Sequence, residues 1–367
     1  MGERSVRDLN MDIAGQLYDM ALIHASPHGR MAYKRAAQAL LRLDVPVDEL
    51  ASKQPLREIP YIGPASELVI AEALEHGLSP SVATAVGKSR RVKEVREAHA
   101  FRTNFLSRAG ALKALRSPAR GAVKREDYRG DLQMHTEWSD GAESIAGMAK
   151  GGVERGYEYI GVSDHSYGLR IARGMSMADV ARQHRQIDAL NLELNGAFRI
   201  LKGIEANIPA EGGVDMTEKE LASFELVLAA PHSRLRRAED QTERMLAAVR
   251  HPSVRILAHP RGRMYSRQGV LARWDEVFEE AARRDVAVEI DGDPYRQDID
   301  HTLARRALEA GCLLALDSDA HSGDELAYAD IALAHARIAK IPPARIVNTW
   351  PAAKLLDWAK RKRPRRR

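Results

Sequence analysis

Apolar residues in the first 85 positions recur at the spacing of amphipathic helices. Segments 14–23, 31–43 and 68–76 each place apolar side chains on one helical face, and Gly77 ends the third segment. Between the second and third segments lies a tight turn, Leu56-Arg57-Glu58-Ile59-Pro60-Tyr61-Ile62-Gly63-Pro64, which predicts a hairpin joining two helices. The sequence therefore predicts a small all-α domain over residues 1–85.

The pattern changes at residue 128, where short apolar or β-branched runs begin to alternate with helical stretches. Alternation of strands and helices predicts a parallel sheet, so the expected fold class is α/β. Seven strand-like runs favour a (β/α)7 barrel, expected over residues 128–355, although their spacing alone leaves an open sheet possible. The runs are 131–134, 159–162, 199–204, 226–229, 255–258, 287–290 and 313–316, and helices are expected over 177–194 and 271–284.

A basic segment connects the two predicted domains. Residues 85–125 hold 12 lysines and arginines but only two acidic residues, and the helix breakers Ser117-Pro118 and Gly121 mark its end. We interpret residues 86–127 as a basic helix followed by a linker. This stretch is too short for a nucleotidyltransferase palm and carries no paired catalytic aspartates, so the sequence does not predict a polymerase.

The net charge of +5 is unevenly distributed along the chain. Residues 1–125 carry 20 basic and 13 acidic residues, and residues 354–367 carry eight and one, whereas residues 126–353 carry 28 and 37. The basic ends, including a predicted tail over 356–367, fit an anionic polymer such as DNA. The tail alone has a second interpretation, since basic tails also serve solubility. The acidic centre suits a site for several cations.

Cysteine content and hydropathy indicate where in the cell the protein is expected. No apolar run approaches the ~18 residues that would span a membrane, and the opening MGERSVRDLN lacks the apolar stretch of a signal peptide. The single cysteine, Cys312, lies in an apolar run and is expected to be buried. One cysteine forms no internal disulfide, so we expect a cytoplasmic protein without membrane contact.

Metal-binding side chains accompany six of the seven predicted strands. Because the carboxyl ends of barrel strands meet on one face, these side chains are expected to converge. Imidazole and carboxylate without thiolate suit Zn, Mn or Fe, and so many donors imply two or three divalent ions. Clustered ions lower the pKa of a bound water, as phosphoester hydrolysis by a metal-bound hydroxide requires. The donors are Gln133, His135, Asp140, His165, Glu205, His232, His259, Asp319 and His321.

Two further groups of residues lie near or outside this set. Arginines suit phosphate binding, and four of them follow predicted strands, although a surface salt bridge is the alternative for each. These are Arg173, Arg261, Arg263 and Arg296. The remaining histidines are interpreted as structural or surface residues: His24, His28, His76, His99, His184, His251, His301 and His335.

The motifs at the strand ends resemble the PHP family, named for polymerase and histidinol phosphatase. The resemblance covers roughly residues 128–355 and looks closest to the C-terminal PHP domain of bacterial family X DNA polymerases. Its motifs here are Gly130-Asp131-Leu132-Gln133-Met134-His135-Thr136-Glu137-Trp138-Ser139-Asp140-Gly141, Ser163-Asp164-His165-Ser166, Gly203-Ile204-Glu205, Pro231-His232-Ser233, His259-Pro260-Arg261-Gly262-Arg263 and Ser318-Asp319-Ala320-His321.

The resemblance implies a distorted seven-stranded barrel with a trinuclear site and phosphoester hydrolysis. By analogy, Gln133, His135, Glu205 and Asp319 would face the first metal, Glu205, His232 and His259 the second, and Asp140, His165 and His321 the third. The residues expected to be catalytic are His135, Glu205, His232, His259 and Asp319. The chain departs from the family at Gln133, where a histidine is usual, so the first metal is expected to bind weakly.

The N-terminal part resembles the small DNA-binding domain of the same polymerases, with its helix-hairpin-helix. The resemblance rests on Ala32-Tyr33-Lys34-Arg35-Ala36-Ala37 and on the hairpin before Pro64, where Tyr61 replaces the usual first glycine. A plain helical bundle is the alternative. If the resemblance holds, DNA contacts are expected at Ile62, Gly63, Lys88, Arg90 and Arg91.

Three functions remain open at this stage. The first is a DNA-processing phosphoesterase acting as a 3′–5′ exonuclease, 3′-phosphatase or abasic-site endonuclease, which the basic ends and the helical domain favour. The second is a small-molecule phosphatase of histidinol-phosphate type. The third is a DNA-binding protein with an impaired metal site, which Gln133 motivates.

Overall fold

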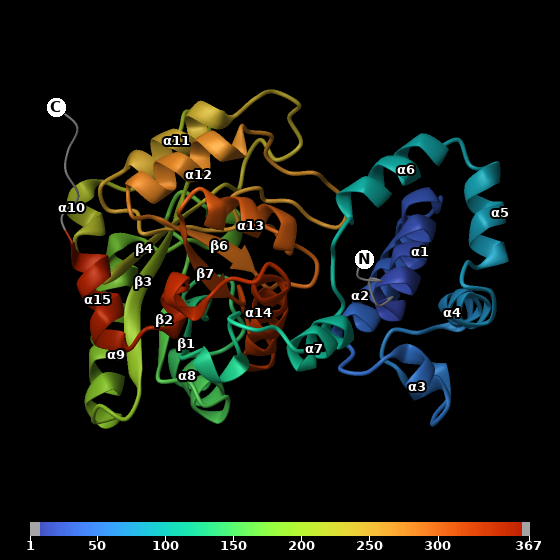
Figure 1. Ribbon diagram of the computed structural model, residues 1–367, viewed down its shortest axis with the longest axis horizontal. Helices are drawn as coiled ribbons and strands as arrows, with labels where there is room; N and C mark the ends of the chain where they lie inside the picture. The colour runs from blue at the N-terminus through green and yellow to red at the C-terminus, as the bar shows by residue number, and fades with distance from the viewer. Residues whose placement is uncertain (1–7, 362–367) are drawn as a thin grey trace. The chain divides into compact units, whose positions relative to one another are not determined.

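The computed structural model describes residues 8–361 and divides the chain into two compact units, Met1–Ser117 and Pro118–Arg367. The first unit is built of helices (Figure 1). Their bounds are α1 Leu9–Ile23, α2 Pro27–Arg42, α3 Val47–Ala51, α4 Pro64–His76, α5 Pro80–Lys88, α6 Val92–Phe101 and α7 Arg108–Arg116, with a short 3-10 turn, η1, at Leu56–Glu58.

Local sequence signals explain where these helices begin and end. The side chain of Ser26 caps α2, and a proline occupies the first turn of both α2 and α4. Gly77 ends α4 with a φ of 80°, a left-handed conformation that glycine adopts without steric cost. All three helices predicted in the first 85 residues are present.

Residues 86–127 were interpreted as a basic helix followed by a linker, but residues 86–117 belong to the helical unit and include α6 and α7. Arg102, one of the basic residues of this segment, is buried and donates hydrogen bonds to Gly15 O at 2.9 Å and Asp19 Oδ1 at 2.7 Å. Ser107 donates from its amide and its hydroxyl to Asp8, both at 2.7 Å. Long-range pairing of these polar residues, which sequence composition does not reveal, explains the difference.

The second unit contains seven parallel strands whose order in the sheet follows the chain, each paired with the next. All seven predicted strands are present, and they form a nearly closed barrel (Figure 1). Their bounds are β1 Gly130–Met134, β2 Tyr159–Val162, β3 Arg199–Asn207, β4 Leu226–Ala230, β5 Ile256–Leu257, β6 Ala287–Asp291 and β7 Leu313–Asp317.

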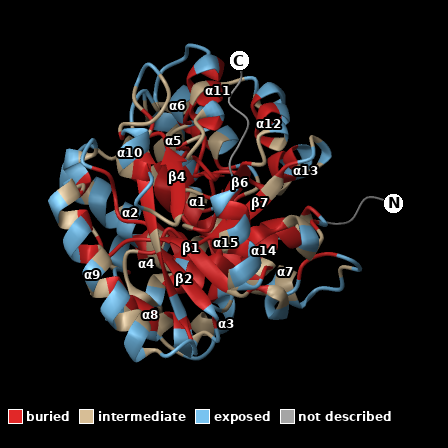
Figure 2. Cartoon of the chain, turned by 90° about the vertical axis from the view of Figure 1, so that its left-hand side faces the viewer, coloured by how far each residue is buried: buried red, intermediate tan, exposed pale blue. Residues whose placement is uncertain are grey.

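Helices surround these strands, with buried residues facing the sheet and exposed residues facing outward (Figure 2). No helix among residues 8–361 is both long and apolar enough to cross a membrane. Cys312 is buried as predicted, and burial raises the pKa of its thiol to about 12. The helices are α8 Ile145–Glu154, α9 Met177–Glu193, α10 Glu218–Leu221, α11 Thr242–Arg250, α12 Trp274–Arg283, α13 His301–Glu309, α14 Ala329–Ile338 and α15 Ala352–Lys360.

Side chains complete the seam between β1 and β7. Asp317 Oδ1 accepts a hydrogen bond from Leu132 N at 2.7 Å, and Asp131 accepts from Ser318 N at 3.2 Å. Asn348, fully buried, donates to Gly130 O at 3.0 Å and to Asp317 Oδ1 at 2.8 Å, and its oxygen accepts from Leu316 N at 2.7 Å. This asparagine therefore links both strands at the point where the barrel closes.

Replacing Asn348 with leucine is expected to lower the free energy of unfolding by about 2–4 kcal/mol, since buried backbone groups lose their partners. The matched control is Asn191→Leu, because Asn191 also bonds a backbone N–H and C=O, those of Ile200, but is only partly buried. Water can replace its contacts, so a loss of about 1 kcal/mol is expected there. Urea unfolding measures both, and equal losses would contradict the role assigned to Asn348.

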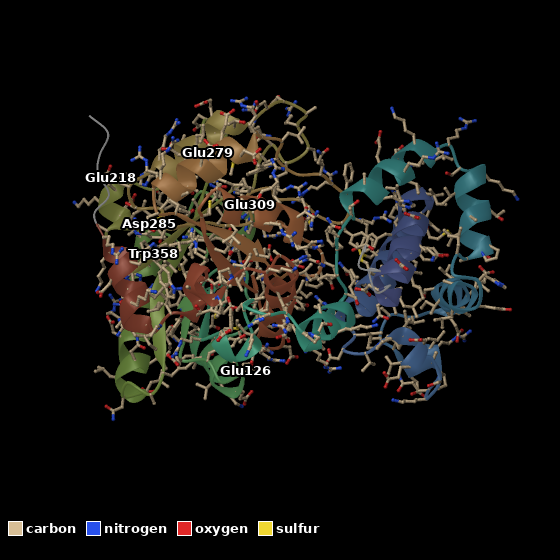
Figure 3. All side chains as sticks on the ribbon, in the orientation of Figure 1. Glu126, Glu218, Glu279, Asp285, Glu309 and Trp358 are labelled. Atoms are coloured by element: carbon tan, nitrogen blue, oxygen red, sulfur yellow. The ribbon has the colours of Figure 1, made fainter. Side chains whose placement is uncertain are left out.

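The C-terminal helix packs into the apolar core of the second unit. Leu355 and Trp358 of α15 belong to one buried cluster with strand residues such as Leu132 and Leu228, and Figure 3 labels Trp358 on this helix. Arg255 donates to the backbone oxygens of Ala359 and Arg361. The predicted tail is therefore wrong at residues 356–360, which complete a packed helix, and residues 362–367 lie outside the described part of the chain.

Candidate metal centre

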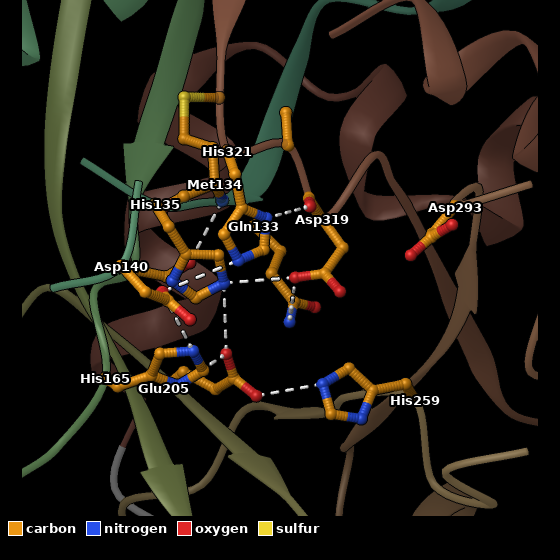
Figure 4. Close-up of polar contacts among 12 residues, drawn as sticks. Gln133, Met134, His135, Asp140, His165, Glu205, His259, Asp293, Asp319 and His321 are labelled. Carbon is orange, nitrogen blue, oxygen red and sulfur yellow. Dashed lines mark hydrogen bonds and ion pairs between the residues drawn. The ribbon is translucent and has the colours of Figure 1, made fainter. Parts of the chain in front are cut away.

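The carboxyl ends of the strands place most of the predicted ligands together (Figure 4). Glu205 of β3 is the centre of the cluster, and its side chain is fully buried. Its Oε1 lies 3.1 Å from His232 Nε2 and 2.9 Å from His259 Nε2. Its Oε2 lies 3.2 Å from both His135 Nε2 and His165 Nδ1. One carboxylate thus faces four imidazoles that come from four different strand ends.

The remaining ligands extend the cluster on two sides. Asp319 Oδ1 lies 3.0 Å from His135 Nε2, and Asp140 Oδ1 lies 3.4 Å from His165 Nε2 and 3.5 Å from His321 Nε2. Three sets of side chains bring donor atoms within 4.8 Å of one another. These sets are His135, Glu205 and Asp319; His165, Glu205 and His232; and His135, Asp140, His165 and His321.

The three sets overlap with the three predicted metal positions but differ from them in membership. His165 was predicted for the third position only, but its ring also takes part in the set with Glu205 and His232, and His135 joins the set of Asp140, His165 and His321. His259 approaches Glu205 without joining a set of three. The donor chemistry fits divalent ions, because imidazoles and carboxylates converge in a buried space with no thiolate among them.

Opposite charges stabilise one another within this cluster. Burial alone would raise the pKa of Glu205, but His165, His259 and His232 lower it well below its usual range. Burial would lower the pKa of His135, yet its hydrogen bonds to Asp319 and Glu205 raise it well above the usual value. Carboxylates that hold imidazolium charge so strongly would equally attract divalent cations.

The backbone is left-handed at two of the ligands, with φ of 23° at His259 and 53° at Asp319. Residues other than glycine adopt this conformation at a cost of about 1–3 kcal/mol, and such residues concentrate at functional sites. Here the conformation turns both side chains toward the cluster after β5 and β7.

Several supporting residues escaped the sequence analysis. Asp164, beside His165, is buried and accepts hydrogen bonds from Thr136 N at 2.8 Å and Gln183 Nε2 at 2.6 Å, which ties the loop after β1 to α9. Asn207 Oδ1 lies 3.2 Å from His232 Nδ1 and orients that ring. A period-two signal was available for Asn207, since it follows Glu205 on the same face of β3.

Glu289 on β6 also escaped the sequence analysis, although an acidic residue inside the apolar run Val288-Glu289-Ile290 is a signal in itself. It is fully buried, and its Oε2 accepts a hydrogen bond from His259 N at 2.6 Å. Burial first, and then the charges of Asp317 and Asp291, raise its pKa well above the usual value.

The predicted phosphate-binding arginines have different fates. Arg296 reaches the cluster, with its Nη1 atom 2.7 Å from Asp319 Oδ2. Arg261 follows His259 by two residues and is half-buried. Arg263 is wrong as a phosphate ligand, because its buried guanidinium donates to Gln297 O at 2.9 Å and faces Asp300 at 3.6 Å. Arg173 is exposed at the end of the 3-10 turn Arg170–Ala172.

The hairpin residues predicted to contact DNA make hydrogen bonds within the helical unit. Gly63 N donates to Ser66 Oγ at 2.9 Å and Ile62 N to Ile59 O at 3.2 Å, and their contacts with DNA stay a prediction. Arg91 donates to Glu94 and to Leu22 O within the unit. Lys88 and Arg90 are exposed, and they remain the candidates for contact with a polyanion.

His335, one of the eight histidines predicted outside the site, lies fully buried in a separate network. Its Nε2 lies 2.8 Å from Gln297 Oε1, and its Nδ1 accepts from His301 N at 3.2 Å. Burial first, and then His301, lower the pKa of His335 to about 3. The folded protein therefore disfavours the protonated ring, while the unfolded chain protonates it near pH 6.5.

Stability contributed by neutral His335 is complete above pH 6.5 and is lost as the pH falls toward 3. Compared with the His335→Gln variant, the wild type is expected to lose about 1.4 kcal/mol more per pH unit between pH 6.5 and 4. Urea unfolding at pH 7, 6 and 5 measures this difference in slope. Parallel pH profiles for the two proteins would contradict the burial of a neutral ring.

The fold and the cluster define an α/β-barrel protein whose strand ends carry a histidine- and carboxylate-lined centre. No family model matches the sequence. The chain is 30% identical over 241 residues to "Probable phosphatase YcdX" of Escherichia fergusonii, a match that covers 62% of this chain and 93% of that protein. The chain belongs to the PHP family, and this membership places it among phosphoesterases.

Two further proteins are similar to parts of the chain. Over 202 residues the chain is 37% identical to "DNA polymerase/3'-5' exonuclease PolX" of Bacillus subtilis, but this match covers 54% of the chain and only 35% of that protein. Histidinol phosphate phosphatase from Lactococcus lactis, solved with Zn, L-histidinol and phosphate, shows a TM-score of 0.43 and 16% identity, covering 57% of this chain and 94% of that one.

Proposed function

We propose that the protein is a metal-dependent phosphoesterase that acts on DNA ends or abasic sites. The observation that carries the proposal is the position of Glu205, whose two oxygens lie within 3.2 Å of four imidazoles at the carboxyl ends of the strands. Two to three ions of Mn, Zn or Fe would be held by Gln133, His135, Asp140, His165, Glu205, His232, His259, Asp319 and His321.

Bound divalent ions would acidify a water and neutralise charge that develops on a phosphate. The chain's own residues prepare the site for this chemistry. Asn207 fixes the ring of His232, and the His259 amide is held by Glu289. Arg296, which contacts Asp319, carries a positive charge to the edge of the cluster, where it can meet a substrate phosphate.

Exposed basic residues of the helical unit support DNA as the substrate. Residues 1–125 carry an excess of seven positive charges, whereas residues 126–353 carry an excess of nine negative charges. We therefore assign DNA binding to residues 1–125 and the basic C-terminus. The acidic barrel would contact DNA only through the divalent ions at its strand ends. The exonuclease activity named for the PolX relative is consistent with this assignment.

The Lys88→Ala, Arg90→Ala double variant is expected to weaken DNA binding and to reduce the slope of log affinity against log salt by about 1 per lost phosphate contact. Fluorescence anisotropy with a labelled, 3′-recessed duplex between 50 and 200 mM salt measures this. The matched control is Lys219→Ala, an equally exposed lysine on the barrel. If the control weakened binding as much, or if residues 118–361 alone bound as well as the full chain, the assignment would be wrong.

A small-molecule phosphatase is the second candidate. The match covers 93% of the YcdX protein but only 62% of this chain, so a phosphatase of that kind has no need of the rest of the chain. A DNA-binding protein with an impaired metal site is the third, because Gln133 stands where the family usually has histidine. Hydrolysis of a chromogenic phosphodiester and a monoester with added Mn²⁺, beside a 3′-labelled oligonucleotide, separates the three. Release of the 3′ label from the oligonucleotide, with or without cleavage of the chromogenic diester, supports the proposal. Cleavage of the chromogenic monoester alone supports the second candidate, and no cleavage supports the third.

A further inference from the structure

Gln133 and Glu289 meet inside the barrel, directly beneath the cluster. Gln133 belongs to β1 and Glu289 to β6, strands that are not neighbours in the sheet, and both side chains are fully buried. Neither residue belongs to the three sets of His, Asp and Glu side chains described above, although Gln133 was predicted to face the first metal. The contact between these two side chains determines whether the amide oxygen or the amide nitrogen of Gln133 faces His135 and Asp319.

The neighbours of an amide assign its oxygen and nitrogen. Figure 4 draws the amide nitrogen on the Asp319 side, 3.4 Å from Asp319 Oδ1, which leaves the amide oxygen against the carboxylate of Glu289. In the opposite orientation the nitrogen lies 2.9 Å from Glu289 Oε2 and also contacts Oε1. Only this second orientation turns a donor toward the two carboxylate oxygens.

Glu289 is held in place to act as that acceptor. The His259 amide donates to the same Oε2 at 2.6 Å, and the rigid strand β6 carries the side chain inward. The side chains of Glu289 and Asp317 are hydrogen-bonded to each other, so a proton on this pair lies between them and leaves the Glu289 carboxyl group an acceptor toward Gln133. The first orientation would instead turn the Gln133 N–H group toward the ions. The two orientations therefore predict opposite behaviour toward metal.

With its nitrogen on Glu289, Gln133 directs its oxygen at Asp319 Oδ1 across 3.4 Å. Two oxygens that face each other without a hydrogen between them repel, and a shared cation removes the repulsion. Oxygen ligands about 2.1 Å from an ion at tetrahedral angles lie about 3.4 Å apart. His135 and Glu205 complete the same position, since His135 Nε2 lies 3.0 Å from Asp319 Oδ1 and 3.2 Å from Glu205 Oε2.

We propose that Glu289 is a positioning residue that fixes the Gln133 amide with its oxygen toward the first metal position. Gln133, Glu205 and Asp319 then supply oxygen, and His135 supplies the only nitrogen. Such an oxygen-rich set favours hard ions such as Mn²⁺ relative to Zn²⁺. The inference rests on the proposed function, because it concerns an ion of the same centre.

Isothermal titration of the metal-free, full-length protein with Mn²⁺ tests this inference through binding alone. Outer-shell partners typically contribute 10–100-fold to metal affinity. Glu289→Met and Gln133→Met are each expected to weaken the weakest Mn²⁺ site by about 10–100-fold. The double variant is expected to bind no more weakly than Gln133→Met alone, because Glu289 acts through Gln133.

Glu289→Gln is the intermediate variant, since its amide oxygen can replace Oε2, which accepts from Gln133 and from the His259 amide, but its NH2 group then faces the Gln133 nitrogen in place of Oε1. It is expected to bind Mn²⁺ more weakly than the wild type and more tightly than Glu289→Met, and it also serves if Glu289→Met does not fold. A crystal structure of the Mn²⁺-loaded wild type gives a second readout, in which the Gln133 oxygen is expected within coordination distance of the ion.

Three results would overturn the inference: unchanged or tighter Mn²⁺ binding in Glu289→Met, additive losses in the double variant, or a Gln133 amide turned away from the ion in the loaded crystal. Additive losses would mean that Glu289 acts through His259 instead. In each of these cases the wild type still binds Mn²⁺, so the proposed function survives. A wild type that binds neither Mn²⁺ nor Zn²⁺ would overturn both.

Discussion

Replacing His232 with alanine is expected to lower phosphoester hydrolysis by at least about 100-fold while the protein stays folded. Even outer-shell partners of a metal contribute 10–100-fold, and His232 lies within 3.1 Å of the central carboxylate of Glu205. Its side chain remains 17% exposed, so water can fill the space that alanine leaves. The variant therefore loses a donor at the second metal position without creating a cavity in the core.

The measurement is kcat/KM on a chromogenic phosphodiester at limiting Mn²⁺, beside a thermal unfolding curve. His251→Ala is the control, because His251 lies at the end of α11, away from the strand ends. His259→Ala is expected to match His232→Ala in activity. Near wild-type turnover in either variant would contradict a catalytic metal at Glu205, His232 and His259.

The second large effect is expected at Gln133, where histidine should raise metal occupancy. Imidazole is a better ligand than an amide oxygen for Zn²⁺ or Mn²⁺, so the affinity of the weakest site should rise about 10-fold or more. The ratio of Zn²⁺ to Mn²⁺ affinity should rise as well, because nitrogen replaces oxygen in the donor set. If the wild type is only partly loaded with metal, the rate of hydrolysis should rise with occupancy.

Elemental analysis and Mn²⁺ titration of Gln133→His, beside the rate on the same diester, separate the possible outcomes. Higher occupancy with higher activity supports an enzyme with one weak site. Higher occupancy with no activity on any phosphoester would favour a barrel retained for binding. A variant that gained no metal would contradict the placement of Gln133 beside the first position, where the structure has its amide 3.4 Å from Asp319.

The strands and most of the donors could be predicted because their signals are local. Runs such as 159–162 and 226–229 are apolar and lie between helical stretches, and the polar residues after them follow from strand polarity. Parallel strands of a barrel share one carboxyl end, so His135, His232 and Asp319 could be expected to meet despite their separation in sequence.

What escaped the sequence analysis depends on contacts between distant residues. Arg263 lies in a motif at a strand end and carries the charge that a phosphate ligand needs, which is why the sequence predicts phosphate binding. Its guanidinium instead donates to the backbone oxygen of Gln297. Arg102 looks like a surface cation and instead pairs with Asp19 across the helical unit. Glu289 stands out as an acidic residue in an otherwise apolar strand. Its partner Gln133 could not be identified from the sequence, because only the barrel brings β1 and β6 together.

The barrel's C-terminal boundary escaped for the same reason. Residues 356–360 belong to a stretch rich in lysine and arginine, which favours a solvated tail. Trp358 nevertheless lies in the apolar cluster of the second unit, and Arg255 bonds the backbone of the last turn of α15. Here two or three buried contacts outweigh the charge of the neighbouring residues.

The central claim is that the strand ends hold divalent ions, and elemental analysis of the full-length protein purified without chelator tests it most directly. The account predicts about two to three ions of Mn, Zn or Fe per chain, with fewer in His232→Ala and unchanged content in His251→Ala. A wild-type protein that contains none of these metals, and binds none when Mn²⁺ or Zn²⁺ is added, would contradict the account.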